Sequence, residues 1–438
     1  MNFQKMRKWL LVVGLFTVTL AACGSNNEDN LNSSDSGEPE VKEEEQVTIR
    51  VAWWGAQDRH DRTLEVIELF EERYPHIRID PEFTDWDGYW QRLTTQAGGG
   101  DLPDVIQMGD AYLNEYDGND LLVDLAPFIA NGSIDLSDVD DVYQDVLKDG
   151  DRTLAISLGA NAFGLIYNRS LAEEHGVFLE PGYTWDEFVA VLKELNPKVG
   201  GDFHGFSFGG AGYELFTVYV RSAGESIYNP QGTGLGFEEQ TLVDFFTMVK
   251  EQTDAGLTPT PDFEAGIIDG SEWWNNRLTY AGLFASNQIV GNAENTDEDL
   301  ALMVLPEVAG GRPGNWLRSS MSFAITTHSE QQEAAAQFID FITNDIEANK
   351  ILQAERGVPI SSSVRDALTE VVPDVVVQTF DFLDVISEHS SPADPLPPAG
   401  ETEIASAFGR VIEGVRLGAI APEEAAKDFM SQAEGILK

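Results

Sequence analysis

The chain has little cysteine, little histidine and few positive charges, and each scarcity excludes something. With Cys23 as its single cysteine, no disulfide can form within the chain. The six histidines are scattered without metal-ligand spacing, so we expect no metal and no other cofactor. The 27 Lys and Arg face 75 Asp and Glu, and the net charge of −48 repels phosphate backbones. We therefore expect no nucleic acid as a partner.

Long apolar runs are also scarce, and the one exception lies at the N-terminus, over Trp9–Leu20. A cationic start precedes it, made of Lys5, Arg7 and Lys8. The run is too short for a permanent membrane span and is typical of a secretory signal. It ends in Leu-Ala-Ala-Cys, which resembles the bacterial lipobox, where the peptide is cut before the cysteine and the thiol is lipidated. We predict a signal peptide over 1–22 and a lipid on Cys23, as the only membrane attachment, on the extracellular face of the cytoplasmic membrane.

The sequence after the predicted signal peptide indicates a tether followed by two globular lobes. Residues 23–46 are polar and acidic and cannot support a core, so they are expected to be a disordered tether. The remainder is too long for one ordinary core. Strands expected at 47–53, 77–83 and 104–108 alternate with amphipathic helices at 62–74 and 86–97. This rhythm indicates an α/β fold with parallel-type sheets flanked by helices.

The later part of the chain predicts a second series of strands and then helices. Thr184 is expected to cap a helix over 188–195, because Glu187 follows three residues later as in a capping box. Further strands are expected at 162–167, 203–208, 280–284, 303–305 and 322–326, and further helices at 333–343, 345–354, 373–387, 403–417 and 422–437.

Ligands of open α/β sheets bind beyond the carboxyl ends of the strands. There the sequence places Trp54 and Gly55 after the first strand, Trp86 after the second and Asp110 after the third. Aromatic planes beside polar tips suit carbohydrate. We expect Trp54 to be exposed in its loop. Trp53 and Trp90 are expected to be core residues.

A small basic cluster, Arg59, His60 and Arg62, follows the first of these loops. Two interpretations stay open. The cluster is either a solvated or salt-bridged surface feature, or it meets an anionic or hydroxyl-rich ligand, since arginine grips a carboxylate bidentately.

Catalytic motifs are weak. Gly205–Gly209 matches the GxSxG pattern of serine hydrolases, in which a sharp turn between a strand and a helix exposes the nucleophilic serine. Here Ser207 is expected within a strand and the turn comes later, so the serine would not be exposed as a nucleophile. A pair of carboxylates for glycoside hydrolysis can always be found among 75 acids and means little. We expect no enzyme. The alternatives left open are a secreted polysaccharide-degrading enzyme (glycoside hydrolase or esterase) and a cell-surface carbohydrate adhesion module.

An ordered set of short motifs resembles a known family. The set comprises the lipobox, the acidic tether, Val51–Gly55, Leu102–Ile106, Leu165–Asn168, Thr184–Glu187 and Arg356–Pro359. Together they are similar to the family 1 extracellular solute-binding proteins of ABC sugar importers. Segments 50–61, 86–90 and 103–113 resemble most closely the binding proteins of pectin-utilisation importers in bacilli, which are linked to rhamnogalacturonan oligosaccharides.

The resemblance implies a periplasmic-binding-protein-like fold of two hinge-connected lobes that close over an oligosaccharide and deliver it to the ABC permease. The first lobe would hold 47–161 and 327–383, the second 162–326 and 384–438. The protein would be a monomer. For Trp273 and Trp274 the resemblance favours core packing. Further ligand contacts would come from the cleft-facing positions Asn161, Tyr213, Asn287, Trp316, Arg318 and Arg356.

A uronate-containing ligand would be anionic, and this conflicts with the charge of the chain. Removal of the three leader cations takes the net charge from −48 to about −51, which hinders the long-range approach of an anion. Arg59, Arg318 or Arg356 would have to supply a complementary field locally. A neutral oligosaccharide would remove the conflict.

Overall fold

The structure is a computed structural model that describes residues 46–144, 147–208, 210–267, 270–395 and 397–438. The predicted signal peptide, Cys23 and most of the tether lie outside these residues. Within them, none of the helices has the length and apolar character needed to span a bilayer.

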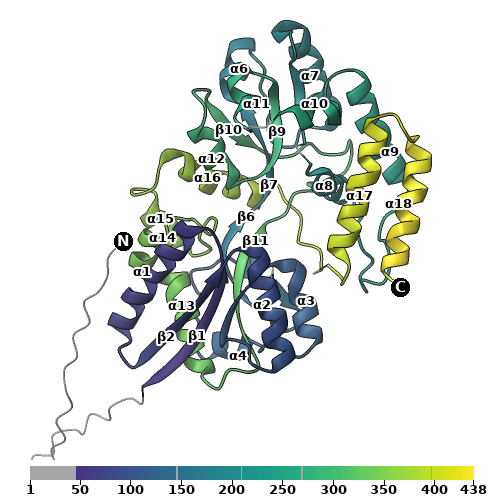
Figure 1. Ribbon diagram of the computed structural model, residues 1–438. Coiled ribbons are helices and arrows are strands. Elements are labelled where there is room, and N and C mark those ends of the chain that lie inside the picture. Colours follow the sequence, from purple (N-terminus) through teal and green to yellow (C-terminus); the bar gives the residue numbers. More distant parts are fainter. Residues whose placement is uncertain (1–45, 145–146, 209, 268–269, 396) are drawn as a thin grey trace, which may run out of the picture. The chain divides into compact units, whose positions relative to one another are not determined.

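Strands and helices alternate along the chain (Figure 1). The strands are β1 (Val47–Trp54), β2 (Ile77–Thr84), β3 (Val105–Met108), β4 (Lys148–Asp149), β5 (Arg152–Thr153), β6 (Ile156–Asn161), β7 (Phe163–Asn168), β8 (His204–Ser207), β9 (Thr279–Ala285), β10 (Leu300–Met303) and β11 (Arg318–Ile325). The helices up to β9 are α1 (Gln57–Arg73), α2 (Trp86–Gly99), α3 (Asp110–Gly118), α4 (Ala126–Ala130), α5 (Asp141–Gln144), α6 (Arg169–His175), α7 (Trp185–Val199), α8 (Gly212–Ser222), α9 (Glu239–Asp254), α10 (Pro261–Gly266) and α11 (Glu272–Asn275). Those after β9 are α12 (Gln288–Glu294), α13 (Gln332–Asn344), α14 (Ile346–Leu352), α15 (Ser362–Leu368), α16 (Asp374–Glu388), α17 (Glu401–Arg416) and α18 (Pro422–Ile436).

The first sheet has five strands in the order β2-β1-β3-β11-β6. β1 pairs in parallel with β2 and β3, while β11 runs antiparallel to β3 and β6. Successive side chains of β1 face opposite sides: Val51 and Trp53 join the core cluster that contains α1, and Ala52 and Trp54 join the cluster that contains α2 and α3. A sheet covered on both faces needs apolar residues at nearly every position, which explains the continuous buried run at the end of β1.

The second sheet has four strands in the order β10-β7-β9-β8. β8 and β9 are parallel, whereas β7 is antiparallel to both β9 and β10. The α/β fold with helix-flanked sheets is confirmed, and both sheets are mixed: the expected parallel pairing holds for β2-β1-β3 and β8-β9. The antiparallel pairs arise where the chain passes from one sheet to the other.

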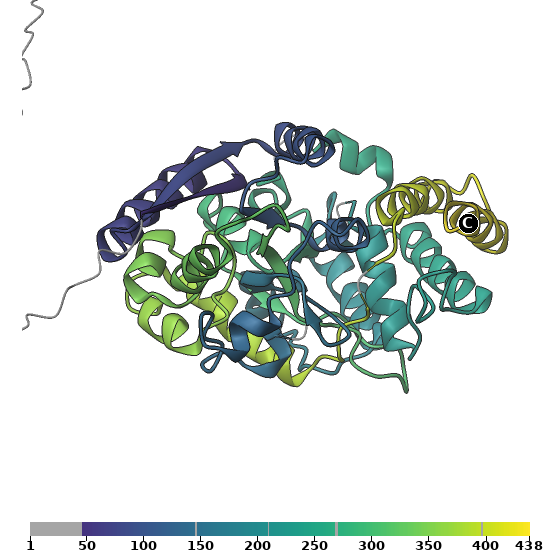
Figure 2. The same ribbon diagram turned by 90° about the horizontal axis from the view of Figure 1, so that it is seen from below.

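That passage occurs at two places. β6 belongs to the first sheet and β7 to the second, and Ala162 alone separates them. β11 then returns the chain to the first sheet. The helix α16 contacts α12 and also β10, which is a strand of the second sheet. The helices α17 and α18 lie side by side (Figures 1 and 2). The division into lobes at 161/162, 326/327 and 383/384 stays a prediction.

Local sequence signals explain most element boundaries and some differences from expectation. The capping box at Thr184 is confirmed: its hydroxyl accepts from the Glu187 N–H, and its own N–H donates to the Glu187 carboxylate. The helix α7 therefore begins at Trp185, earlier than expected. The helix α1 also begins earlier than expected, at Gln57. Its N-cap residue, Ala56, has no side chain that could cap the helix, so the sequence carries no capping signal for this start.

Candidate functional site

The two sheets meet at the junction between β6 and β7, and this junction positions the candidate site. Asn161 ends β6 and lies opposite Arg318, the first residue of β11. The Ser286 N–H, just beyond β9, donates to the Ala162 carbonyl at 2.9 Å. The ends of β6, β9 and the start of β11 are thus held together by backbone hydrogen bonds. Two of the predicted site residues, Asn161 and Arg318, are brought side by side.

The Arg318 guanidinium lies against aromatic rings. Its central carbon is 4.9 Å from the centroid of the Phe163 ring and 5.7 Å from that of the Trp316 ring. Among the described residues, no hydrogen bond or ion pair to this guanidinium is formed. Its donors are therefore available for a ligand, while the rings hold its plane in place.

The carboxyl group of Asp110 is close enough to Arg318 for its pKa to be affected by that charge. Asp110 is the first residue of α3, and Gly109 separates it from the end of β3. Burial raises the pKa of Asp110 to about 6, and the charge of Arg318 and the residue's own N–H oppose that rise. Its Oδ1 is buried and has no hydrogen-bond partner among the described residues. A ligand hydroxyl could satisfy this oxygen.

Glu401 is the second acidic group in the field of Arg318. Its Oε2 accepts hydrogen bonds from the hydroxyls of Tyr213, at 3.2 Å, and of Tyr228. The two tyrosine hydroxyls also lie 3.1 Å apart. Burial raises the pKa of Glu401, and the tyrosine hydrogen bonds and Arg318 oppose the rise. Tyr213 is a ligand-contact candidate from the sequence, and its hydroxyl lies within this network.

An aromatic group stands at the carboxyl ends of β1 and β2. Trp54 meets Trp86 edge-on at 4.9 Å between centroids, and Trp90 stacks on Tyr112 at 3.7 Å. Trp86 is 45% exposed, while Trp54 is only 9% exposed. The expectation of an exposed Trp54 ring is wrong, because α2 packs three aromatic side chains around it. Trp86 is the ring of this group that can stack on a sugar. Trp53 is fully buried, as expected.

The basic cluster after β1 is not a set of free cations. Arg59 is bound by Glu355 through Nε at 2.8 Å and through Nη2 at 2.8 Å, and its Nη1 donates to the Trp54 carbonyl. His60 is buried and accepts a hydrogen bond from the Trp53 indole at 3.1 Å. Burial and the charge of Arg59 lower the pKa of His60. The salt-bridged alternative holds for Arg59, and His60 is a core residue.

Arg356 is buried near the same ion pair. Its Nη2 donates to Thr63 at 2.6 Å, while Nε and Nη1 have no hydrogen-bond partner among the described residues. Burial lowers its pKa to about 10. Its carbonyl accepts from Ser320 on β11, so the backbone touches the junction, but the side chain reaches away toward α1.

The remaining predicted residues take separate positions. Gly55 follows β1, and a Cβ there would collide with the Arg59 side chain. Asn287 is exposed before α12, one residue after Ser286. Trp316 is half-buried, with the Arg221 guanidinium 4.6 Å from its centroid on one side and Arg318 beside it.

Phe163, Tyr228 and Glu401 were missed from sequence. Glu401 follows a proline-rich loop and is the first residue of α17, so its only sequence signal is an acidic first turn. Such turns are common at helix N-termini and do not single out a site. The aromatic Phe163 lies in a strand and reads as core.

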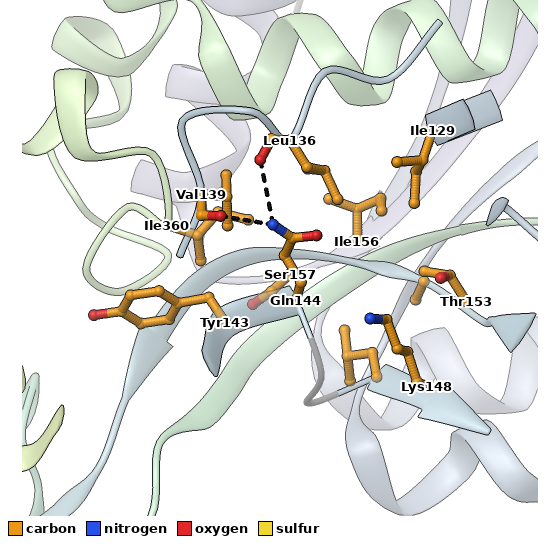
Figure 3. A pocket seen from close by; sticks show the side chains of 12 residues that line it. Ile129, Leu136, Val139, Tyr143, Gln144, Lys148, Thr153, Ile156, Ser157 and Ile360 are labelled. Carbon is orange, nitrogen blue, oxygen red and sulfur yellow. Dashed lines mark hydrogen bonds between the residues drawn. The ribbon is translucent and has the colours of Figure 1, made fainter. Parts of the chain in front are cut away.

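A small cavity lies elsewhere in the molecule, between the 129–148 segment and β6 (Figure 3). Its volume is about 20 Å³, and mostly apolar side chains line it. The Gln144 amide donates to the carbonyls of Val139 and Leu136 at its edge. The space suffices for about one water molecule and excludes a sugar.

Two further features concern metal-ligating side chains and the serine of the GxSxG pattern. Across the described residues no group of three or more His, Cys, Asp or Glu is arranged to hold a metal ion. Ser207 of the GxSxG pattern ends β8, is buried, and donates to Glu264 at 3.2 Å. Its strand position agrees with the sequence interpretation.

Comparison with known proteins identifies the family. The family model described as "Bacterial extracellular solute-binding protein" matches residues 57–348, more than half of the chain. The chain belongs to this family.

Full-length likenesses agree with the family assignment and with the two-lobed fold. An extracellular solute-binding protein family 1 from Alicyclobacillus acidocaldarius is 25% identical with a TM-score of 0.78, covering 90% of this chain and 99% of that one. A periplasmic oligogalacturonide binding protein from Yersinia enterocolitica is 26% identical with a TM-score of 0.73, covering 89% and 99%. A putative binding protein of Brucella abortus is 25% identical over 99% of both chains.

Proposed function

We propose that this solute-binding protein is the lipid-anchored receptor of an ABC importer and captures a uronate-containing oligosaccharide, of the rhamnogalacturonan type, between its lobes. Family membership supports the receptor role. The likeness to a protein named for oligogalacturonide binding supports an acidic sugar. The single observation that carries the proposal is the Arg318 guanidinium at the junction of the two sheets, which forms no hydrogen bond or ion pair with any described residue.

The geometry around Arg318 suits one acidic sugar unit. Arginine binds a carboxylate through two parallel N–H bonds, and the flanking Phe163 and Trp316 rings keep the guanidinium oriented. Asn161, directly opposite on β6, adds an amide for a neighbouring hydroxyl. The exposed ring of Trp86 offers a stacking face for another unit, as sugar faces prefer.

Capture requires no chemistry on the sugar. The ligand shifts the equilibrium between open and closed forms by the difference in its affinity for them, and the permease would recognise the closed form. The connections at Ala162 and at β11 are the segments that would absorb a lobe rotation. The proposed anchor at Cys23 and the polar segment after it would keep this monomeric receptor near the permease.

Calorimetric titration of the protein from residue 24 onward tests the proposal. The ligand panel comprises rhamnogalacturonan fragments, oligogalacturonides and neutral oligosaccharides. We expect binding of the rhamnogalacturonan fragments and a loss of about ten- to a hundredfold in affinity for Arg318→Met, because a hydrogen-bonded charge pair contributes about 1.5–3 kcal/mol. Arg169→Met is the matched control, since that arginine pairs with Asp299 at the surface.

Each result has a definite meaning. Equal affinity of wild type and Arg318→Met for the acidic fragments would refute the role of Arg318. Binding of neutral sugars alone would refute the uronate assignment. Fragment cleavage during titration would favour the enzyme alternative, and polymer binding without compaction in small-angle scattering would favour an adhesion module.

A further inference from the structure

A larger cavity, distinct from the Arg318 site, lies between α7 and α9. Its volume is about 410 Å³, within the range of small-molecule pockets. One face of α7 and one face of α9 form its long walls, Tyr219 of α8 and Leu257 contribute to its lining, and the loop at Val308 and Ala309 completes it. Figure 1 shows α7, α8 and α9 on the part of the chain that carries the second sheet. None of the residues around Arg318 lines it.

The inner wall combines apolar surface with a buried polar group that lacks a partner. Trp185 is 6% exposed, and its indole nitrogen is buried without a hydrogen-bond acceptor among the described residues. Tyr219 and Gln252 also line this wall. An unpaired buried donor costs free energy that a ligand acceptor would recover.

The rim carries charge of both signs. Asp186, Asp244 and Glu251 are exposed acids, and Lys193 is an exposed cation that forms no ion pair among the described residues. Asp244 accepts a hydrogen bond from Gln240 on its own helix. The rim therefore offers acceptors and donors together. An anionic ligand would be repelled, because the acids of the rim outnumber its cation by two. A simple cation would leave Lys193 and the indole N–H without a hydrogen-bond acceptor.

A neutral sugar ring matches this combination. Its C–H faces pack on aromatic and aliphatic surface, here Tyr219, Met248 and Val189. Its hydroxyls both donate, to the rim carboxylates, and accept, from Lys193 and the Trp185 indole. We propose that the cavity between α7 and α9 is a second saccharide site that binds one neutral sugar unit without participation of the first sheet. It does not depend on the uronate proposal, because it shares no residue with the Arg318 site.

The Trp185 indole proton is the reporter for this site. Indole ¹⁵N–¹H spectra of the protein from residue 24 onward are recorded, and Trp185→Phe identifies the resonance by its disappearance. Neutral monosaccharides and their methyl glycosides, with tetramethylammonium as the cationic probe, are titrated into wild type and into Arg318→Met. We expect a saturable shift of the Trp185 signal with a neutral sugar and the same dissociation constant in both proteins.

Filling the cavity provides the decisive variant. Thr247→Trp places a large side chain from α9 into it, and Lys250→Trp places the same residue one turn away, outside the lining. Thr247→Trp should weaken sugar binding by about tenfold or more, while Lys250→Trp should leave it unchanged. Saturation-transfer signals of the sugar protons give a second readout in every variant, and circular dichroism confirms folding.

The inference would be overturned by the absence of a saturable Trp185 shift with any neutral sugar, by equal binding of the sugar to Thr247→Trp and Lys250→Trp, or by a response to tetramethylammonium alone. If Thr247→Trp does not fold, Val189→Phe on α7 replaces it and must show the same loss. Loss of this response in Arg318→Met would also contradict the inference, since it would trace the signal to the other site.

Discussion

Replacing Asp110 by Asn should stabilise the protein at neutral pH and leave it unchanged in acid. Burial raises the pKa of Asp110 from 3.8 to about 6, so the folded protein disfavours the charged form. Each pKa unit corresponds to 1.36 kcal/mol, which gives an upper bound of about 3 kcal/mol. Because the residue retains some solvent contact, we expect about 1–3 kcal/mol.

The sign follows from proton counting. Between about pH 4 and pH 6 the folded state holds a proton on Asp110 that the unfolded state has lost, so wild-type stability declines relative to the variant as pH rises through this window. Asp110→Asn should therefore be more stable above about pH 6 and equal to wild type near pH 3.5. The measurement is urea unfolding of both proteins across this range.

Asp138→Asn is the matched control because its sign is opposite. Hydrogen bonds from Ser362, Ser363 and Ser361 hold the pKa of Asp138 far below its ordinary value. That carboxylate stabilises the fold above about pH 4, and its contribution is lost as pH falls, so Asp138→Asn should be destabilised at neutral pH. Equal or lower stability of Asp110→Asn at neutral pH, with the control behaving as expected, would refute the reasoning.

Four further substitutions test other parts of the fold by urea unfolding. Gly357→Ala should cost about 1–3 kcal/mol, because φ is 105° and a Cβ would lie 2.9 Å from the Ala160 carbonyl; Gly98→Ala, in an open helix position, should instead stabilise by about 0.5–1 kcal/mol. Arg356→Met should be neutral or stabilising by about 1 kcal/mol, because it removes a buried cation that has two nitrogens without hydrogen-bond partners among the described residues and only a long ion-pair contact, 3.8 Å, with Glu355, and a loss of stability would contradict this. Thr184→Ala should cost about 0.5–2 kcal/mol through loss of the capping box, while an unchanged midpoint would refute it.

Sequence reasoning succeeded where the determinants are local. The strand at β1, its buried Trp53 and the capping box at Thr184 follow from periodicity and from hydrogen bonds between near neighbours. The ordered motifs identified the family, and through it the two-lobed fold. The helices α8 and α9 were not predicted individually, although both have an apolar face that packs in the core.

The site was harder to predict because its groups come from distant parts of the chain. Arg318 was selected by position in the family, but its place opposite Asn161 depends on the register between β6 and β11, and its stacking on Phe163 depends on where the chain crosses from β6 to β7. The sequence could not show whether Arg59 contacts a ligand or forms an ion pair, since its partner Glu355 lies almost three hundred residues away. Trp54 was misjudged because its burial depends on the packing of α2 rather than on its place after a strand.

The raised pKa values of the carboxyl groups near Arg318 provide a test of whether the ligand is anionic. Arg318 faces two carboxyl groups, Asp110 and Glu401, and both have raised pKa values. A uronate bound at Arg318 would raise the pKa of Asp110 further, so binding would take up a proton. Uronate affinity should then increase as pH falls from about 8 to about 6, whereas a neutral sugar that donates a hydroxyl to Asp110 favours its charged form and shows the opposite trend. Calorimetric titrations in buffers of different ionisation enthalpy measure this proton uptake, and proton release on binding of the acidic fragments would refute the assignment of Arg318 as their receptor.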